Sequence, residues 1–226
     1  MLSFLFYLFE FLPVIFYVSF LRRNKHEGLQ VIFIYCATSL GTEILGPILK
    51  KVFSVSTFYI LASFTVIEYS LLTIFLYQSI QEPRHKYVPI IGSVAFFVIA
   101  IINFLQGRTS NFDSYSASVE AILIIIYSLL FLYGQIKDPA ILFVYNTKKF
   151  WVVSAFFIYF SSTLFLFLYA ATFTKQEHNN YWYINNLFDI IKNILFCIAF
   201  TMKTSSKSRN PIEDRHEDPY EDRYLT

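Results

Sequence analysis

Five acidic residues lie within long apolar stretches of the sequence, and they are the residues best able to do chemistry. A carboxyl group at membrane depth is costly, so such a group commonly marks an ion route, a proton relay or a ligand site. We therefore take these side chains as the candidate functional residues. They are Glu10, Glu43, Glu68, Glu120 and Asp189.

The five acids are predicted to lie at similar depths in a membrane. Glu10 precedes the basic residue Arg22 by about 12 positions, and Asp189 precedes Lys203 by about 14. At 1.5 Å of helix rise per residue, the carboxyl groups fall roughly 18–27 Å from the predicted cytoplasmic boundary. This is the middle or outer half of a hydrocarbon core about 30 Å thick. Glu10 is the weakest member of the layer, since it could lie near the outer interface.

The last apolar stretch, NNLFDIIKNILF, carries a polar stripe. Asn186, Asp189 and Asn193 recur at the helical spacing i, i+3, i+7, with Lys192 beside them. A stripe of this kind should face the interior of a bundle, where Asp189 and Lys192 can pair. We predict one polar site for a small ligand or a cation, with no metal ligands and no cofactor clearly implied. Its candidate residues are Glu43, Glu68, Glu120, Asn186, Asp189, Lys192 and Asn193.

The composition indicates the environment of these residues. Hydrophobic residues make up 56% of the chain and charged residues 15%, against roughly 25% charged in soluble domains. The 27 Phe and 17 Tyr suit lipid contact and the membrane interface. A net charge of +2 is too small to indicate a nucleic-acid partner. The sequence therefore predicts an integral membrane protein whose main partner is the lipid bilayer.

Seven apolar runs are long enough to cross a bilayer, which requires about 20 residues each. The fold class is thus all-α, a polytopic membrane bundle of about seven transmembrane helices. We expect residues 1–203 to form this domain and the polar residues 204–226 to form a disordered cytoplasmic tail. The runs are 2–21, 29–49, 52–80, 88–105, 116–133, 150–172 and 183–202.

The basic residues predict the orientation. Arg and Lys gather in alternate connections, which places the N-terminus outside and the C-terminus in the cytoplasm. Only the pair Lys50–Lys51 disagrees. The first run lacks the basic region and cleavage site of a signal peptide, so we expect a retained helix. The predicted location is the cell (inner) membrane, with several passes. The supporting residues are Arg22, Arg23, Lys25, Arg84, Lys86, Lys137, Lys148, Lys149, Lys203, Lys207 and Arg209.

Motifs of known enzyme chemistry are missing from the sequence. The four histidines, His26, His85, His178 and His216, fall in predicted connections or the tail, which argues against an intramembrane zinc hydrolase. There is no G-x-S-x-G elbow, P-loop or G-x-G-x-x-G. We therefore expect no catalytic residues, although a carboxyl pair could do acid–base chemistry.

Several stretches resemble those of uncharacterised seven-helix membrane proteins of Bacteroidota-type bacteria. These are IEYSLLTIFLY, NFDSYSASVEAILI, FWVVSAFFIYFSSTLFLF and INNLFDIIKNILFCIAF. The resemblance implies a sensory or signalling role. Our leading interpretation is a receptor-like or sensor-like bundle that passes its signal to a separate cytoplasmic or membrane protein. The alternatives are an ion- or proton-coupled transporter of small molecules, an intramembrane lipid-modifying enzyme, and an accessory subunit.

Overall fold

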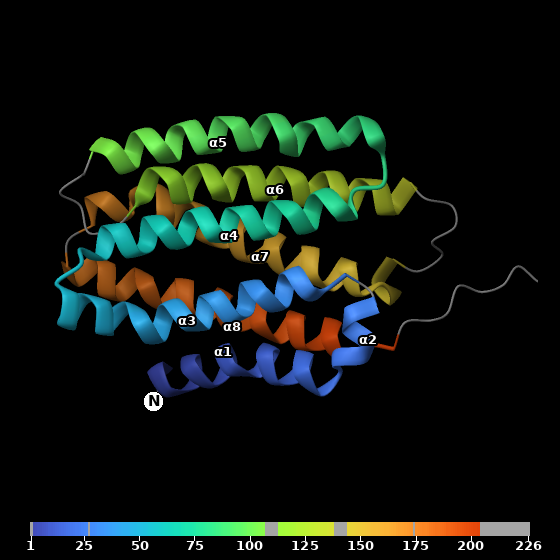
Figure 1. Cartoon of the computed structure of the whole chain (residues 1–226), viewed down its shortest axis with the longest axis horizontal. Helices are drawn as coiled ribbons and strands as arrows, with labels where there is room; N and C mark the ends of the chain where they lie inside the picture. Colours follow the sequence, from blue (N-terminus) through green and yellow to red (C-terminus); the bar gives the residue numbers. More distant parts are fainter. Residues whose placement is uncertain (1, 27, 107–112, 138–143, 174, 204–226) are drawn as a thin grey trace, which may run out of the picture.

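The computed structural model describes residues 2–26, 28–106, 113–137, 144–173 and 175–203, and all regular elements in this part are helical (Figure 1). The long helices are α1 (Leu2–Ser19), α3 (Gln30–Phe53), α4 (Thr57–Ser79), α5 (Tyr87–Gln106), α6 (Ser114–Lys137), α7 (Lys148–Tyr169) and α8 (Lys175–Thr201). The short ones are α2 (Leu21–His26), η1 (Pro83–Lys86), η2 (Val144–Asn146) and η3 (Ala170–Thr172).

Six helical segments among the described residues are long and apolar enough to cross a membrane. The prediction of an all-helical, multi-pass membrane protein is thus confirmed at this level. The first predicted run forms α1, whose fully described part, Leu8–Ser19, is shorter than a span, so the count of seven spans and the orientation stay predictions. Residues 204–226 lie outside the described residues. The six segments are Gln30–Phe53, Thr57–Ser79, Pro83–Gln106, Ser114–Lys137, Lys148–Tyr169 and Tyr181–Thr201.

One helix boundary differs from the prediction. The sequence indicates a break near Lys50 and Lys51 and one long run from 52 to 80, but α3 continues to Phe53. The break comes at Ser54, which takes the left-handed conformation with φ of 53° and ends α3, and Ser56 is extended. The turn at residues 54–56 contains no Gly, Pro or charged residue, so the hydrophobicity of the sequence does not show where α3 ends.

Six of the long helices form a closed ring. Along the ring, α1 contacts α3, α3 contacts α4, α4 contacts α6, and α6, α7, α8 and α1 follow in order. Helix α5 lies outside the ring and packs on α4 and α6 (Figure 1). Its segment has the highest mean hydropathy of the six, 2.5, and carries no acidic residue, which suits a helix that faces lipid on most sides.

The two ends of the bundle are packed differently. We call the end that holds the chain start and the α3–α4 connection the N-terminal end, and the end that holds α2 the tail end (Figure 1). At the tail end, the ring of Tyr17 stacks on Phe33 at 4.4 Å and meets Phe200 edge-on at 5.3 Å. The Arg23 guanidinium donates to the carbonyl oxygens of Phe200 and Thr201 at 3.1 and 2.5 Å. These contacts satisfy the last carbonyls of α8 and close this end.

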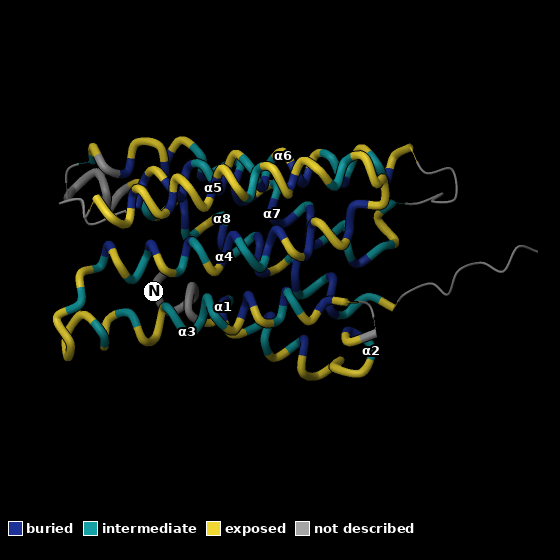
Figure 2. The backbone as a smooth tube through the Cα atoms, turned by 45° about the horizontal axis from the view of Figure 1, so that its top comes forward, coloured by how far each residue is buried: buried dark blue, intermediate teal, exposed yellow. Residues whose placement is uncertain are grey.

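Helix α3 is well packed only in its first half. Its buried residues are Ile32, Tyr35 and Cys36, and none of residues 37–53 is buried (Figure 2). The second half of α3 therefore lies at the edge of the bundle near the N-terminal end, where it is packed against the other helices less closely than the first half is.

Candidate functional site

A cavity of about 120 Å³ lies inside the ring of helices. All six ring helices contribute to its wall, and α5 does not. The wall carries six carboxyl groups and one ammonium group among polar and aromatic side chains. The lining residues are Glu10, Tyr35, Ser39, Thr42, Glu43, Leu61, Phe64, Thr65, Glu68, Asp113, Ala117, Glu120, Tyr159, Phe160, Phe167, Trp182, Asn185, Asp189 and Lys192.

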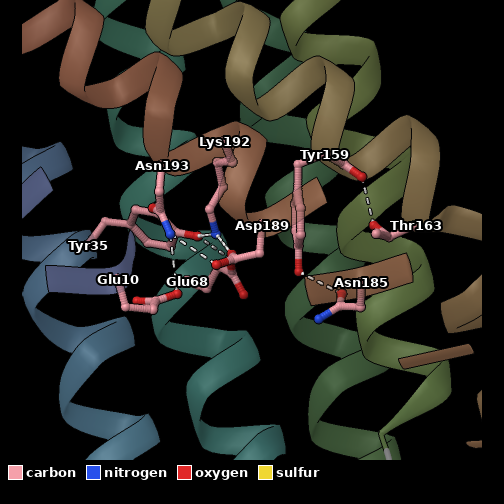
Figure 3. A network of polar contacts seen from close by, with 9 residues as sticks. All are labelled: Glu10, Tyr35, Glu68, Tyr159, Thr163, Asn185, Asp189, Lys192 and Asn193. Carbon is pink, nitrogen blue, oxygen red and sulfur yellow. Dashed lines mark hydrogen bonds and ion pairs between the residues drawn. The ribbon is translucent and has the colours of Figure 1, made fainter. Parts of the chain in front are cut away.

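Lys192 of α8 is the centre of a polar network in the wall of the cavity (Figure 3). Its ammonium forms an ion pair with Asp189, one helical turn earlier, and donates to the Tyr35 hydroxyl at 2.8 Å. The Tyr35 hydroxyl in turn donates to Glu68 Oε1 at 2.9 Å. These contacts join α8, α3 and α4, and they give the buried ammonium the partners that a charge in a low-dielectric interior requires.

Aromatic faces complete the surroundings of this ammonium. Lys192 Nζ lies 4.4 Å from the ring centroid of Tyr159 and 5.2 Å from that of Tyr35. Both distances allow a cation–π interaction. The Tyr159 hydroxyl donates to Asn185 Oδ1 at 3.1 Å, so α7 is tied to α8 one further turn toward the N-terminal end. The cavity therefore already stabilises one positive charge through both carboxylates and aromatic rings.

Asn193 links α1 to the same network. Its amide donates to Asp189 Oδ2 at 2.9 Å and to Glu10 Oε1 at 3.4 Å, the second at the upper limit for a hydrogen bond (Figure 3). Glu10 is 4% exposed, so it lies within the bundle and not at an open interface. The weakest sequence candidate thus belongs with the others.

Below this network, toward the tail end, the ring interior is filled by aromatic side chains. The Phe156 and Phe196 rings pack edge-on at 5.5 Å, and both meet the Tyr35 ring at 6.1 Å. Phe75 meets Phe156 at 6.2 Å, and all four side chains are fully buried. Edge-on aromatic packing of this kind is favourable, and none of Phe75, Phe156 and Phe196 lines the cavity, which ends at this layer in the described structure. The cavity is therefore closed toward the tail end.

Glu120 of α6 differs from Glu10, Glu68 and Asp189, which accept hydrogen bonds or an ion pair from side chains of the described structure. The side chain is 2% exposed and lines the cavity, and its Oε1 atom has no hydrogen-bond donor in the described part of the chain. A buried acceptor without a donor is expensive and calls for an explanation. The simplest explanation is that a molecule bound in the cavity donates a hydrogen bond to Glu120 Oε1.

A second acid at the N-terminal end of α6 is only half satisfied. Asp113 Oδ1 accepts from the Asn103 amide, and from the Ser116 backbone N–H at 3.2 Å, as an N-cap would. Asp113 Oδ2 is buried, and no described donor reaches it. Burial raises the pKa of the Asp113 carboxyl, while the hydrogen bonds from Ser116 and Asn103 act in the opposite direction.

The sequence-predicted residues divide into three groups. Glu43, Glu68, Glu120, Asp189 and Lys192 all line the cavity. Asn193 lies behind it and hydrogen-bonds two lining residues. Asn186 is half-buried and does not line the cavity, and its neighbour Asn185 does so instead.

Other lining residues had weaker signals in the sequence. Asn185, Asp189 and Lys192 follow the spacing i, i+4, i+7, which is as helical as the spacing from Asn186, so the pattern alone could not choose between them. Asp113 lies just before an apolar run and looks like a loop residue. Tyr35 and Tyr159 have the pattern of ordinary core aromatics, and only their hydroxyl contacts show otherwise.

Glu43 lies on the weakly packed half of α3 and is exposed, as are parts of Ser39 and Thr42 beside it. Since a carboxylate facing lipid is costly, this exposure indicates that the cavity is reached from this side near the N-terminal end.

The described residues contain no group of three or more His, Cys, Asp or Glu side chains arranged to hold a metal ion. Comparison with protein-family models, with curated proteins and with solved structures gave no match to this chain.

Proposed function

We propose that this chain is a receptor-like membrane bundle that binds a small organic cation, an amine in its ammonium form, in the carboxylate-lined cavity. The observation that carries the proposal is Glu120, a buried acid whose Oε1 has no donor in the described structure and which faces the cavity. An ammonium group would supply that donor in a charge-assisted hydrogen bond. The aromatic side chains of Phe160, Phe167 and Trp182 would cover the apolar part of such a ligand.

The packing of the bundle supports a receptor-like role. The cavity is reachable near the N-terminal end and is closed by aromatic side chains toward the tail end, which suits binding without passage. The half-exposed second half of α3 carries Ser39, Thr42 and Glu43 on the cavity wall. In the proposed mechanism, a bound cation draws this segment toward the ring. The altered packing is then passed to a separate membrane or cytoplasmic protein. With the N-terminus outside, the ligand would arrive from the outer side.

The first test is the thermal stability of the detergent-purified protein in butylamine at neutral pH. Butylamine is protonated there, and a ligand that binds only the folded state raises the Tm. We expect wild type and Glu82→Gln to show the shift, because Glu82 is exposed and lies outside the cavity. Glu120→Gln should lose it. Absence of a shift in wild type, or an equal shift in Glu120→Gln, would contradict the proposal.

A second candidate function is an ion- or proton-coupled transporter. The network of Lys192, Asp189, Tyr35 and Glu68 favours it, because ionisable groups that join three helices at mid-depth are what coupled transport requires. Proteoliposomes distinguish the two functions. Accumulation of labelled butylamine that stops in Glu68→Gln would indicate transport. Saturable binding with no accumulation would indicate the receptor.

A further inference from the structure

Two buried carboxylate oxygens in the cavity have no donor in the described structure. They are Glu120 Oε1 and Asp113 Oδ2, and each residue is only 2% exposed. Both residues line the same cavity. Glu10, Glu68 and Asp189 also line it, but each of these accepts at least one hydrogen bond or ion pair from a protein side chain. The cavity thus presents two separate acceptor positions.

The two acceptors lie along one side of α6. They are seven residues apart, which is close to two helical turns, so they face in nearly the same direction. The rise over seven residues is roughly 10 Å. A charge-assisted hydrogen bond of about 2.8 Å at each end would leave roughly 5 Å between two donor nitrogens.

The part of α6 that lines the cavity between the two acceptors is apolar. Ala117 lies between them on the same face of α6 and lines the cavity with only a methyl group. Phe160, Phe167 and Trp182 of α7 and α8 also line the cavity. A hydrocarbon segment between two charged ends would therefore meet apolar surface along its length. The ammonium of Lys192 of α8 also lines the cavity, and it would repel a positively charged end of the ligand, which favours positions near the acids of α6.

We propose that the ligand is a short linear diamine of about three to four carbons, with one ammonium on Glu120 and the other on Asp113. This inference rests on the proposed function, because it names the chemical class of the organic cation. A monoamine satisfies one of the two acceptors and leaves the other without a donor. A diamine satisfies both and places its methylene groups against Ala117 and the aromatic side chains.

The test compares the affinities of diaminobutane and butylamine for the purified full-length protein, measured by isothermal titration calorimetry at neutral pH. Both compounds have the same carbon chain, and both are fully protonated. We expect diaminobutane to bind about 10- to 100-fold more tightly than butylamine, as one added charge-assisted hydrogen bond would give. In a series of diamines, affinity should peak at three to four carbons and fall for diaminooctane, which exceeds the spacing.

The variant Asp113→Asn gives the matched control. Asparagine keeps the Oδ1 acceptor for Ser116 and Asn103 but removes the charge at the Oδ2 position. We expect this variant to bind diaminobutane and butylamine with equal affinity. Glu82→Gln should keep the wild-type preference.

The outcomes separate the two proposals. Wild type that binds butylamine as tightly as every diamine would overturn the diamine inference and leave the amine receptor standing. Wild type that binds neither would overturn both. A diamine preference that survives in Asp113→Asn would also overturn the inference, because the second ammonium would then be held elsewhere.

Discussion

At the scale of single residues, the buried ammonium of Lys192 is held by several partners of unequal importance. Asp189 neutralises its charge, Tyr35 accepts a hydrogen bond, and the Tyr159 ring offers a cation–π contact. Removing one member of a buried ion pair leaves the other charge without compensation, which is far more costly than removing both. This asymmetry makes the network testable without any ligand.

We predict that Lys192→Met lowers the free energy of unfolding by about 3–5 kcal/mol, because it leaves the buried Asp189 carboxyl without its cationic partner. The double variant Lys192→Met/Asp189→Asn should be more stable than Lys192→Met alone, since asparagine carries no charge. A double-mutant cycle from thermal or denaturant unfolding in detergent measures the coupling. Additive effects of the two substitutions would show that the ion pair contributes nothing.

Asp113, which precedes the spanning segment Ser114–Lys137, should make the stability of the protein depend on pH. Its pKa is raised in the folded protein, so the folded state holds the proton more tightly than the unfolded chain. The resulting stability is fully present below the unfolded pKa of about 3.9 and is lost as the pH rises through the raised pKa. Asp113→Asn removes this contribution.

The stability of Asp113→Asn relative to wild type should therefore increase as the pH rises across that window. Thermal unfolding of both proteins from about pH 4 to pH 7 gives the comparison, and Glu82→Gln controls for a general change in charge. A difference between Asp113→Asn and wild type that is constant with pH would show that Asp113 titrates as an exposed carboxyl does.

The residue scale also shows where sequence reasoning reaches its limit. The acids within apolar runs line the cavity, and their role in binding stays a prediction. The choice between Asn185 and Asn186 depended on the rotation of α8 about its own axis. One sequence does not determine that rotation. Asp113 was missed because its burial depends on Asn103 of another helix.

At the scale of helices, α5 and α6 meet where a glycine allows close approach. A Cβ atom added to Gly92 of α5 would clash with the Tyr127 hydroxyl and would lie 3.2 Å from Leu123 Cδ2. Tyr127 is fully buried, and its hydroxyl shares a 3.1 Å hydrogen bond with Tyr69. The Tyr127 ring therefore cannot move away without losing that contact.

We predict that Gly92→Ala destabilises the protein by about 1–3 kcal/mol through overpacking. Gly134→Ala is the matched control, because its added methyl group would meet no described atom within 4 Å and alanine favours helix. It should be neutral or stabilising. Adding Tyr127→Phe should partly rescue Gly92→Ala by removing the hydroxyl. Equal stabilities of the two alanine variants, measured by thermal unfolding, would contradict this account of the α5–α6 contact.

The helices themselves were largely predictable, and the exceptions have physical reasons. Runs of about 20 apolar residues identify membrane-spanning helices, because a helix of that length crosses the hydrocarbon core and satisfies its own backbone hydrogen bonds. The α3–α4 boundary was misplaced because the turn at Ser54 contains no Pro or Gly and follows an apolar stretch. The weak packing of residues 37–53 could not be foreseen, since their composition is like that of the packed helices.

At the scale of the whole molecule, the ring of helices creates a bundle that is open near one end and closed at the other. The aromatic packing around Phe156, together with the Arg23 contacts to α8, closes the tail end. Six carboxyl groups and one ammonium group line the cavity, so it should concentrate cations and exclude anions. A cavity that prefers cations over anions is expected both for a receptor of organic cations and for a transporter coupled to ions or protons.

The most direct test is the reactivity of a cysteine placed at Ser39 on the cavity wall, after Cys36 and Cys197 are replaced by alanine. Methanethiosulfonate reagents with a cationic trimethylammonium group and an anionic sulfonate group are compared, with Ser56→Cys as the exposed reference outside the cavity. We predict a cation-to-anion rate ratio at position 39 roughly tenfold or more above that at position 56, lowered by Glu120→Gln. Equal ratios at the two positions would contradict a cation-selective cavity.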